Sequence, residues 1–89
     1  MNKKTQYILS DQVKYTCEVN CVKIFREDTH DMLIISYPEA ALWDMVLQNY
    51  SLSEMAKMMT AIMQKNKSEM ENWIALTIQT WINIGLLMH

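Results

Sequence analysis

The segment from Met32 to Met45 is the part of the sequence that most restricts what the chain can fold into. Four large apolar residues in a row, Met32 to Ile35, predict an apolar strand that ends at Ser36. A helix is predicted to begin at Pro38, because proline already has a helical φ and its missing N–H would have no intrahelical partner there. We expect Ser36 to cap this helix and Glu39 to place a negative charge at the positive end of its dipole. The strand is therefore expected to dock directly onto the helix that follows it.

Three helices are predicted in the second half of the chain. The first runs from about Pro38 to Gln48, where apolar residues recur at helical spacing. Ser51-Leu-Ser-Glu54 has the spacing of a capping box and predicts the start of the second helix. Ser68-Glu-Met-Glu71 is a second capping box and opens a helix that reaches about Ile84. Gly85 is placed to end it.

Two strands are predicted before the central segment. Val13–Cys17 alternates apolar and polar residues, and Cys21–Arg26 is rich in residues that favour strands. A two-residue turn at Val19-Asn20 would place Cys17 opposite Val22 and put the apolar side chains on one face, with a three-residue turn as the alternative. With the strand of the central segment, the prediction is a three-stranded antiparallel meander followed by three helices, an α+β fold.

Size and composition predict one domain, residues 1–89, with residues 1–10 as a lead-in that is ordered only in part. The apolar fraction of 51% is enough for a core, and the net charge of −2 gives no reason to expect a nucleic acid or an anionic membrane as partner. No run approaches the ~18 apolar residues of a membrane span, and no signal-peptide pattern follows the first residues. The expected location is the cytoplasm.

The side chains that carry catalytic or metal chemistry are few. Cys17 and Cys21 are the only cysteines, and together with His30 and His89 they are too few for a structural zinc site. We therefore predict ordinary thiols, no metal and no cofactor. Neither cysteine has a histidine at a spacing that suggests an activated nucleophile, so the chain is not predicted to be an enzyme.

The last helix is predicted to be apolar on more than one side. One stripe suits a core, and a second, adjoining stripe contains Trp73, Leu76, Thr77 and Thr80. From Ser68 to the end of the chain there is no Lys or Arg. The second stripe must be covered, either by the meander or by a partner in a groove.

The order of these features resembles the PqqD-like family, named for pyrroloquinoline quinone biosynthesis protein D and also described as precursor-peptide recognition elements. The resemblance rests on Ile35–Trp43 at the junction of strand and helix, on Ser51–Glu54, and on Trp81–Leu87 at the end of the last helix. It covers roughly residues 7 to 88. Ser36 stands where the family usually has Asn, so specificity within the family is left open.

The resemblance implies a winged-helix-like fold and a non-catalytic adaptor. Such proteins bind the leader of a ribosomally made precursor peptide as an added strand and present it to a maturation enzyme, such as a radical S-adenosylmethionine protein, a cyclase or a leader protease. The implied groove lies between the third strand and the last helix, with selectivity pockets around Ile34 and the second stripe. The implied peptide-binding residues are Met32, Leu33, Ile34, Ile35, Ser36, Trp73, Leu76, Thr77 and Thr80.

Two other functions compete with the adaptor. A DNA-binding winged helix needs Lys or Arg on its recognition helix, and neither Pro38–Gln48 nor the stretch after Ser68 has any. A small assembly subunit remains an alternative, because an open strand edge and an apolar helix face also suit a homodimer.

Overall fold

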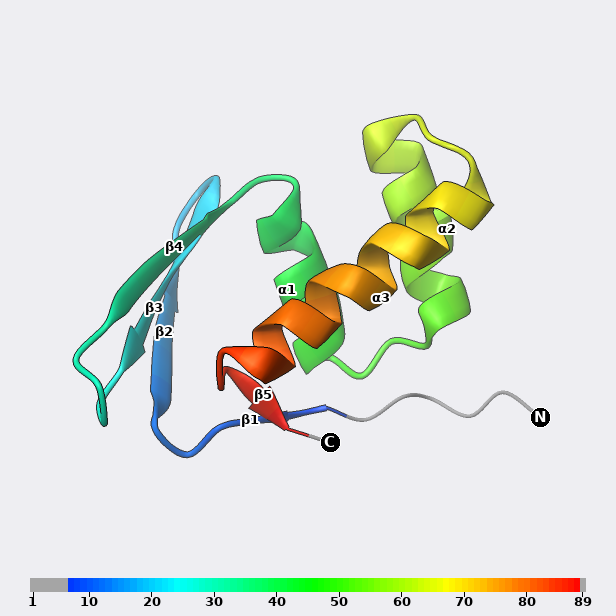
Figure 1. Ribbon diagram of the computed structural model, residues 1–89. Coiled ribbons are helices and arrows are strands. Elements are labelled where there is room, and N and C mark those ends of the chain that lie inside the picture. The colour runs from blue at the N-terminus through cyan, green and yellow to red at the C-terminus, as the bar shows by residue number, and fades with distance from the viewer. Residues whose placement is uncertain (1–6, 89) are drawn as a thin grey trace.

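The computed structural model describes residues 7–88 as a three-stranded antiparallel meander followed by three helices, which confirms the predicted α+β class (Figure 1). The elements are β1 (Ile8–Leu9), β2 (Val13–Cys17), β3 (Cys21–Arg26), β4 (Met32–Ser36), α1 (Glu39–Leu47), α2 (Leu52–Met63), α3 (Lys67–Asn83) and β5 (Leu87–Met88). The predicted lead-in, residues 1–10, lies partly outside the described residues, and its last part forms β1. Among residues 7–88, no helix has the length and apolar character needed to cross a membrane.

The meander has the order β2-β3-β4 and the register predicted from sequence. Cys17 pairs with Val22, as the two-residue turn requires, and Val22 in turn pairs with Ile35 of β4. Ile24 pairs with Leu33, so these side chains share the face that looks toward the helices. Val22, Ile24 and Ile35 are all buried on that face.

The junction between β4 and α1 is as short as predicted, but the capping is different. Pro38 is the N-cap rather than the first helical residue, and no side chain makes a capping hydrogen bond there. The predicted cap by Ser36 is therefore wrong, because Ser36 is still part of β4 and pairs with Cys21. Glu39 lies in the first turn of α1, as predicted.

The capping box of α2 is confirmed. The Ser51 Oγ accepts a hydrogen bond from the Glu54 N–H at 3.1 Å, and the Glu54 Oε1 accepts one from the Ser51 N–H at 2.9 Å. For α3 the predicted cap at Ser68 is wrong, because Asn66 is the N-cap and its Oδ1 accepts from the Glu69 N–H at 2.8 Å. Asn66-x-x-Glu69 has the same spacing as the predicted box, and the helix begins one residue before Ser68.

The end of α3 lies at Gly85, as predicted. Gly85 has a φ of +84°, which a side chain disfavours. The Leu86 N–H donates to the Trp81 carbonyl at 2.8 Å and the Gly85 N–H to the Ile82 carbonyl at 3.0 Å. This is a Schellman motif, and its apolar contact is supplied by Leu86 and Trp81, which are both buried.

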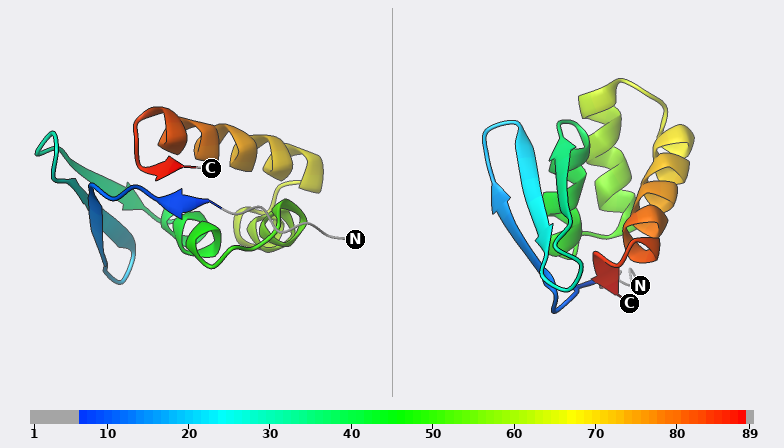
Figure 2. Two further views of the ribbon diagram at one scale, coloured as in Figure 1. Left: turned by 90° about the horizontal axis from the view of Figure 1, so that it is seen from below. Right: turned by 60° about the vertical axis from the view of Figure 1, so that its left-hand side comes forward.

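A small second sheet joins the two ends of the described chain. β1 pairs antiparallel with β5, with Ile8 opposite Met88 and Leu9 opposite Leu87. The pair lies below α1 and the end of α3 in Figure 1, and Figure 2 shows the same arrangement from below. This sheet was not predicted from the sequence.

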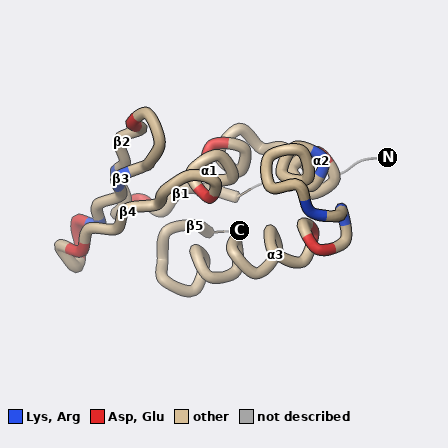
Figure 3. The backbone as a smooth tube through the Cα atoms, turned by 90° about the horizontal axis from the view of Figure 1, so that it is seen from above, with Lys and Arg blue, Asp and Glu red and all other residues tan. Residues whose placement is uncertain are grey.

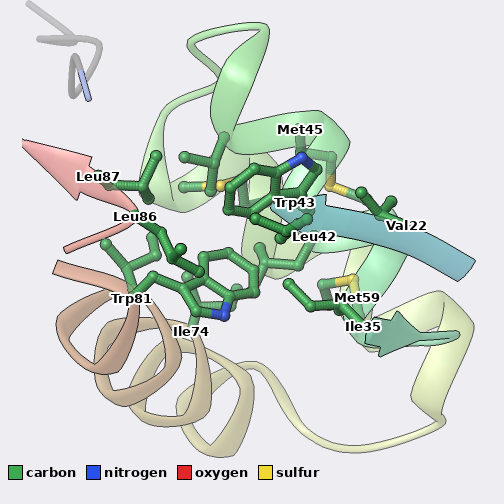
Figure 4. Close-up of a cluster of buried hydrophobic side chains, with 14 of the residues drawn as sticks. Val22, Ile35, Leu42, Trp43, Met45, Met59, Ile74, Trp81, Leu86 and Leu87 are labelled. Atoms are coloured by element: carbon green, nitrogen blue, oxygen red, sulfur yellow. The ribbon is translucent and has the colours of Figure 1, made fainter. Parts of the chain in front are cut away.

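The core is centred on Trp43 of α1 (Figure 4). Its ring packs edge to face against Trp81 of α3, with ring centroids 5.2 Å apart, and against Tyr15 of β2 at 5.9 Å. The Trp43 side chain therefore connects α1 to both the meander and α3. Methionines fill much of the remaining space, with Met45, Met55, Met59 and Met70 all buried.

Replacing Gly85 by alanine should destabilise the fold by about 1–2 kcal/mol, because an L residue is disfavoured at this φ. A Cβ at this position would also lie 2.8 Å from the Arg26 Nη1. Urea unfolding followed by circular dichroism measures the loss. Gly85→Asn is the matched control: asparagine tolerates the left-handed region but still adds a Cβ, so a milder loss assigns the effect to backbone conformation. An unchanged urea midpoint for Gly85→Ala would contradict the prediction.

Candidate functional site

β4 is an edge strand with unused hydrogen-bonding groups. Two bonds at the ends of the β3–β4 ladder fix its phase: the Arg26 N–H donates to the Asp31 carbonyl and the Tyr37 N–H to the Asn20 carbonyl, both at 2.9 Å. In an antiparallel pair the residues that bond to the neighbour alternate with those that do not. Asp31 and Tyr37 face β3, so every second residue between them also faces β3.

The other residues of β4 direct their main chain to the free edge. By this alternation, Met32, Ile34 and Ser36 point their N–H and C=O groups away from β3. The strand contains no Lys or Pro that would blunt the edge. An extended peptide could therefore add to β4 and hydrogen-bond to three of its residues.

A groove runs along β4, between this strand and the last turns of α3. It consists of two adjoining hollows that share Leu33 and Ile84, and we call it the β4–α3 groove. The first hollow, of about 420 Å³, is lined by Leu33, Ile34, Ile35, Ser36, Tyr37, Glu39, Thr80, Trp81 and Ile84. The second, of about 230 Å³, is lined by Ile24, Arg26, Asp31, Met32, Leu33, Ile84 and Leu86. The right-hand view of Figure 2 shows β4 on the side of the meander that faces the helices.

The groove exposes apolar side chains to solvent. Leu33 is 38% exposed and Ile84 43% on the side of β4 that faces α3, where Ile35 is buried, and Met32 and Ile34 are 66% and 55% exposed on the other side. The Met32 and Ile34 side chains point to the face opposite Leu33 and Ile35, because side chains alternate along a strand. A strand added to β4 would cover apolar surface on both of its faces.

Arg26 connects the meander to the end of α3. Its Nη1 donates to the Ile84 carbonyl at 2.6 Å, one of the carbonyls left free at the helix C-terminus. Its Nη2 and Nε donate to the two carboxylate oxygens of Asp28 at 2.6 and 3.1 Å. These hydrogen bonds lower the pKa of the Asp28 carboxyl below its usual value. The link sets the spacing of β4 and α3 at one end of the groove.

The structure brings some of the residues named from sequence together and separates others. The five residues of β4 and Thr80 all line the groove. Trp73, Leu76 and Thr77 line neither hollow, although Leu76 is 70% exposed on α3. Their role in peptide binding stays a prediction. Several lining residues were not predicted as site residues: Tyr37, Glu39, Asp31, Arg26, Ile24, Trp81, Ile84 and Leu86. The position of Gly85 at the predicted end of the last helix is a signal that points to Ile84.

The His, Cys, Asp and Glu side chains, which could bind a metal or act as nucleophiles, do not cluster within the described residues. Within residues 7–88, no three His, Cys, Asp or Glu side chains come close enough to hold a metal ion. Cys17 is exposed and Cys21 half-buried, and both are free thiols. The site offers main-chain hydrogen bonds and apolar contacts, which suit binding.

The fold is shared with two solved structures. No protein-family model and no curated protein matches the sequence. A lasso peptide synthetase B1, complexed with the leader peptide, superposes with a TM-score of 0.87 at 12% identity, over 96% of this chain and 100% of that one. TbiB1, in complex with the TbiA(beta) leader peptide, superposes with a TM-score of 0.81 at 15% identity, over 90% of this chain and 93% of that one. Both neighbours hold a leader peptide. At these identities the likeness shows the fold.

Proposed function

We propose that this protein is a non-catalytic adaptor that captures the leader segment of a ribosomally made precursor peptide by strand addition. The observation that carries the proposal is the open edge of β4 beside an apolar groove. The two proteins of the same fold, both in complex with leader peptides, support it. The adaptor presents the bound peptide to a maturation enzyme, such as a radical S-adenosylmethionine protein, a cyclase or a leader protease. We infer membership of the precursor-peptide recognition elements, in line with the PqqD-like resemblance, and action in the cytoplasm.

The geometry of β4 determines how an added strand would lie. In the antiparallel orientation, the N-terminal end of the peptide lies at Ser36 and its C-terminal end at Met32. Peptide residues opposite Met32, Ile34 and Ser36 exchange main-chain hydrogen bonds with them. Peptide residues opposite Leu33 and Ile35 point their side chains into the groove. Main-chain bonds would supply affinity, and the groove would supply selectivity.

The test is a titration of isotope-labelled protein with the leader of a short precursor encoded beside it, followed by amide NMR shifts. Shifts concentrated on β4 and on the last turns of α3 from Thr80 to Ile84 are expected. Absence of binding, with a concentration-dependent dimer that uses the same residues, would instead favour the assembly-subunit alternative. No feature of the groove favours nucleic acid, since α3 has no Lys or Arg after Lys67.

A second prediction concerns which part of α3 contacts the bound peptide. Thr80→Arg should weaken peptide capture at least about five-fold, because a long charged side chain would enter the first hollow. Leu76→Arg is the matched control, since Leu76 lies one turn earlier on the same helix and outside the groove. Affinities from the NMR titration compare the two variants. Equal weakening by both changes would extend the site toward Trp73 and Thr77, and no weakening by Thr80→Arg would remove α3 from it.

A further inference from the structure

The two ends of the β4–α3 groove are both acidic. Glu39 lines the first hollow and Asp31 the second, and both residues are exposed. Neither carboxylate forms an ion pair with another described residue. The groove therefore places one carboxylate without an ion pair at each end of an apolar strip.

Every described cation is either used elsewhere or remote from the groove. Among residues 7–88, Arg26 is the only cation that lines the groove, and it is occupied by Asp28 and by the Ile84 carbonyl. Lys14 and Lys23 pair with glutamates of the meander. The remaining described lysines are Lys57 on α2, Lys65 between α2 and α3, and Lys67 at the start of α3. Figure 3 shows β4 and the part of α3 beyond its first turns without charged residues. Cations on an occupant of the groove would therefore find two carboxylates that no described cation pairs with.

The strand register fixes where an occupant's charges would lie. Consider an extended peptide segment that pairs antiparallel with residues 31–37, one residue opposite each position. Its first residue then lies opposite Tyr37 and its last opposite Asp31. Its odd positions point into the groove, because Leu33 and Ile35 do so and side chains alternate. The first side chain therefore lies in the hollow that contains Glu39, the middle two lie over the apolar strip, and the last lies directly opposite Asp31.

We propose that the occupant of the groove is an extended segment of the pattern basic-x-apolar-x-apolar-x-basic, with its N-terminal cation at Glu39 and its C-terminal cation at Asp31. This inference rests on the leader-capture function proposed above and names the chemistry of the leader. Opposite charges directly across two strands stabilise the pairing, and like charges weaken it.

The same charges disfavour a second copy of this chain as the occupant. If two β4 strands paired antiparallel about a two-fold axis at Ile34, Asp31 of each copy would lie opposite Tyr37 of the other. Each Asp31 would then approach the Glu39 end of the second groove. Two like-charge contacts would oppose this pairing. A cationic peptide removes that repulsion.

The test uses three synthetic peptides with acetylated and amidated ends and a common Thr-Val-Thr-Leu-Thr centre. They carry Lys, Gln or Glu at both outer positions, and the probe is amide NMR shifts of the labelled full chain at low salt. We expect the Lys peptide to bind roughly three- to twenty-fold more tightly than the Gln peptide, as two exposed ion pairs allow, and the Glu peptide to bind most weakly. Addition of 0.5 M salt should remove most of the difference.

Substitutions inside and outside the groove distinguish the effect of the groove's own charges on peptide preference from the effect of the protein's net charge. Glu39→Gln combined with Asp31→Asn should make the three peptides bind alike. Glu71→Gln, near the start of α3 and outside the groove, should leave the discrimination intact. Equal binding of all three peptides to the unaltered protein, or a preference for Glu, would overturn this inference and leave leader capture standing. If none of the three binds and the native leader also fails, the proposed function falls with it.

Discussion

Ile34→Pro should reduce peptide affinity at least about ten-fold while the protein stays folded. The Ile34 N–H points to the free edge of β4, so proline removes a donor that the β3–β4 ladder does not use. An added strand would lose that hydrogen bond, and the proline ring would hold the peptide away from the neighbouring main chain. Peptide titration gives the affinity, and circular dichroism melting shows whether the fold is kept.

Two variants of the same strand serve as controls for this change. Leu33→Pro removes an N–H that faces β3 and leaves its acceptor there without a partner, so it should destabilise the protein by about 1–3 kcal/mol. Ile34→Ala removes the side chain but keeps the donor, and should weaken binding less than Ile34→Pro. Affinity of Ile34→Pro within two-fold of the unaltered protein would show that the peptide does not add to this edge.

Trp43→Ala should destabilise the protein by about 3–5 kcal/mol, the usual loss when a buried Trp or Phe is truncated. The side chain is fully buried and contacts Tyr15 and Trp81, so its removal opens a cavity where meander, α1 and α3 meet. In a domain of this size, 3–5 kcal/mol corresponds to a fall in Tm of more than about 12 °C. Far-UV circular dichroism is the measurement, because the change also removes a fluorophore.

Trp43→Phe and Trp73→Ala complete this experiment. The Trp43 Nε1 is buried without a hydrogen-bond partner among the described residues, so phenylalanine removes an unsatisfied donor and should cost less than alanine. Trp73 is only half-buried on α3, and its truncation should cost less than that of Trp43. A loss of stability below about 1 kcal/mol for Trp43→Ala would mean that contacts other than those of Trp43 hold the meander, α1 and α3 together.

Local sequence patterns predicted the strands and their register, because alternation and a two-residue turn act over a few residues. The caps of α1 and α3 show the limit of such patterns. Ser36 lay within reach of the first helix in sequence, but the ladder with β3 retained it in β4. Asn66 and Ser68 both precede a glutamate at the correct spacing, and the sequence alone does not choose between them.

The candidate groove was predicted in outline and not in detail. Both of its walls, β4 and the last helix, follow from local apolar patterns. The part of α3 that meets β4 depends on how the helix crosses the meander, which is set by packing around Trp43 and Trp81 and by the contact of Arg26 with Ile84. Residues Trp73, Leu76 and Thr77 share a helix face with Thr80 in sequence, yet only Thr80 reaches the groove. The β1–β5 sheet joins strands of two residues from opposite ends of the chain, and such a pairing has no local signal.

The pairing of Ile8 with Met88 makes this domain a module with one point of attachment. Because the chain enters and leaves the fold side by side, a host protein could carry the domain as an insertion in a single surface loop without pulling the fold apart. A circular permutant that links Met88 to Tyr7 and opens at the exposed β2–β3 turn should keep the meander, the helices and the groove in place. If the protein captures a leader as proposed, one linker at this site would be enough to tether the captured peptide close to the active site of an enzyme that carries the domain.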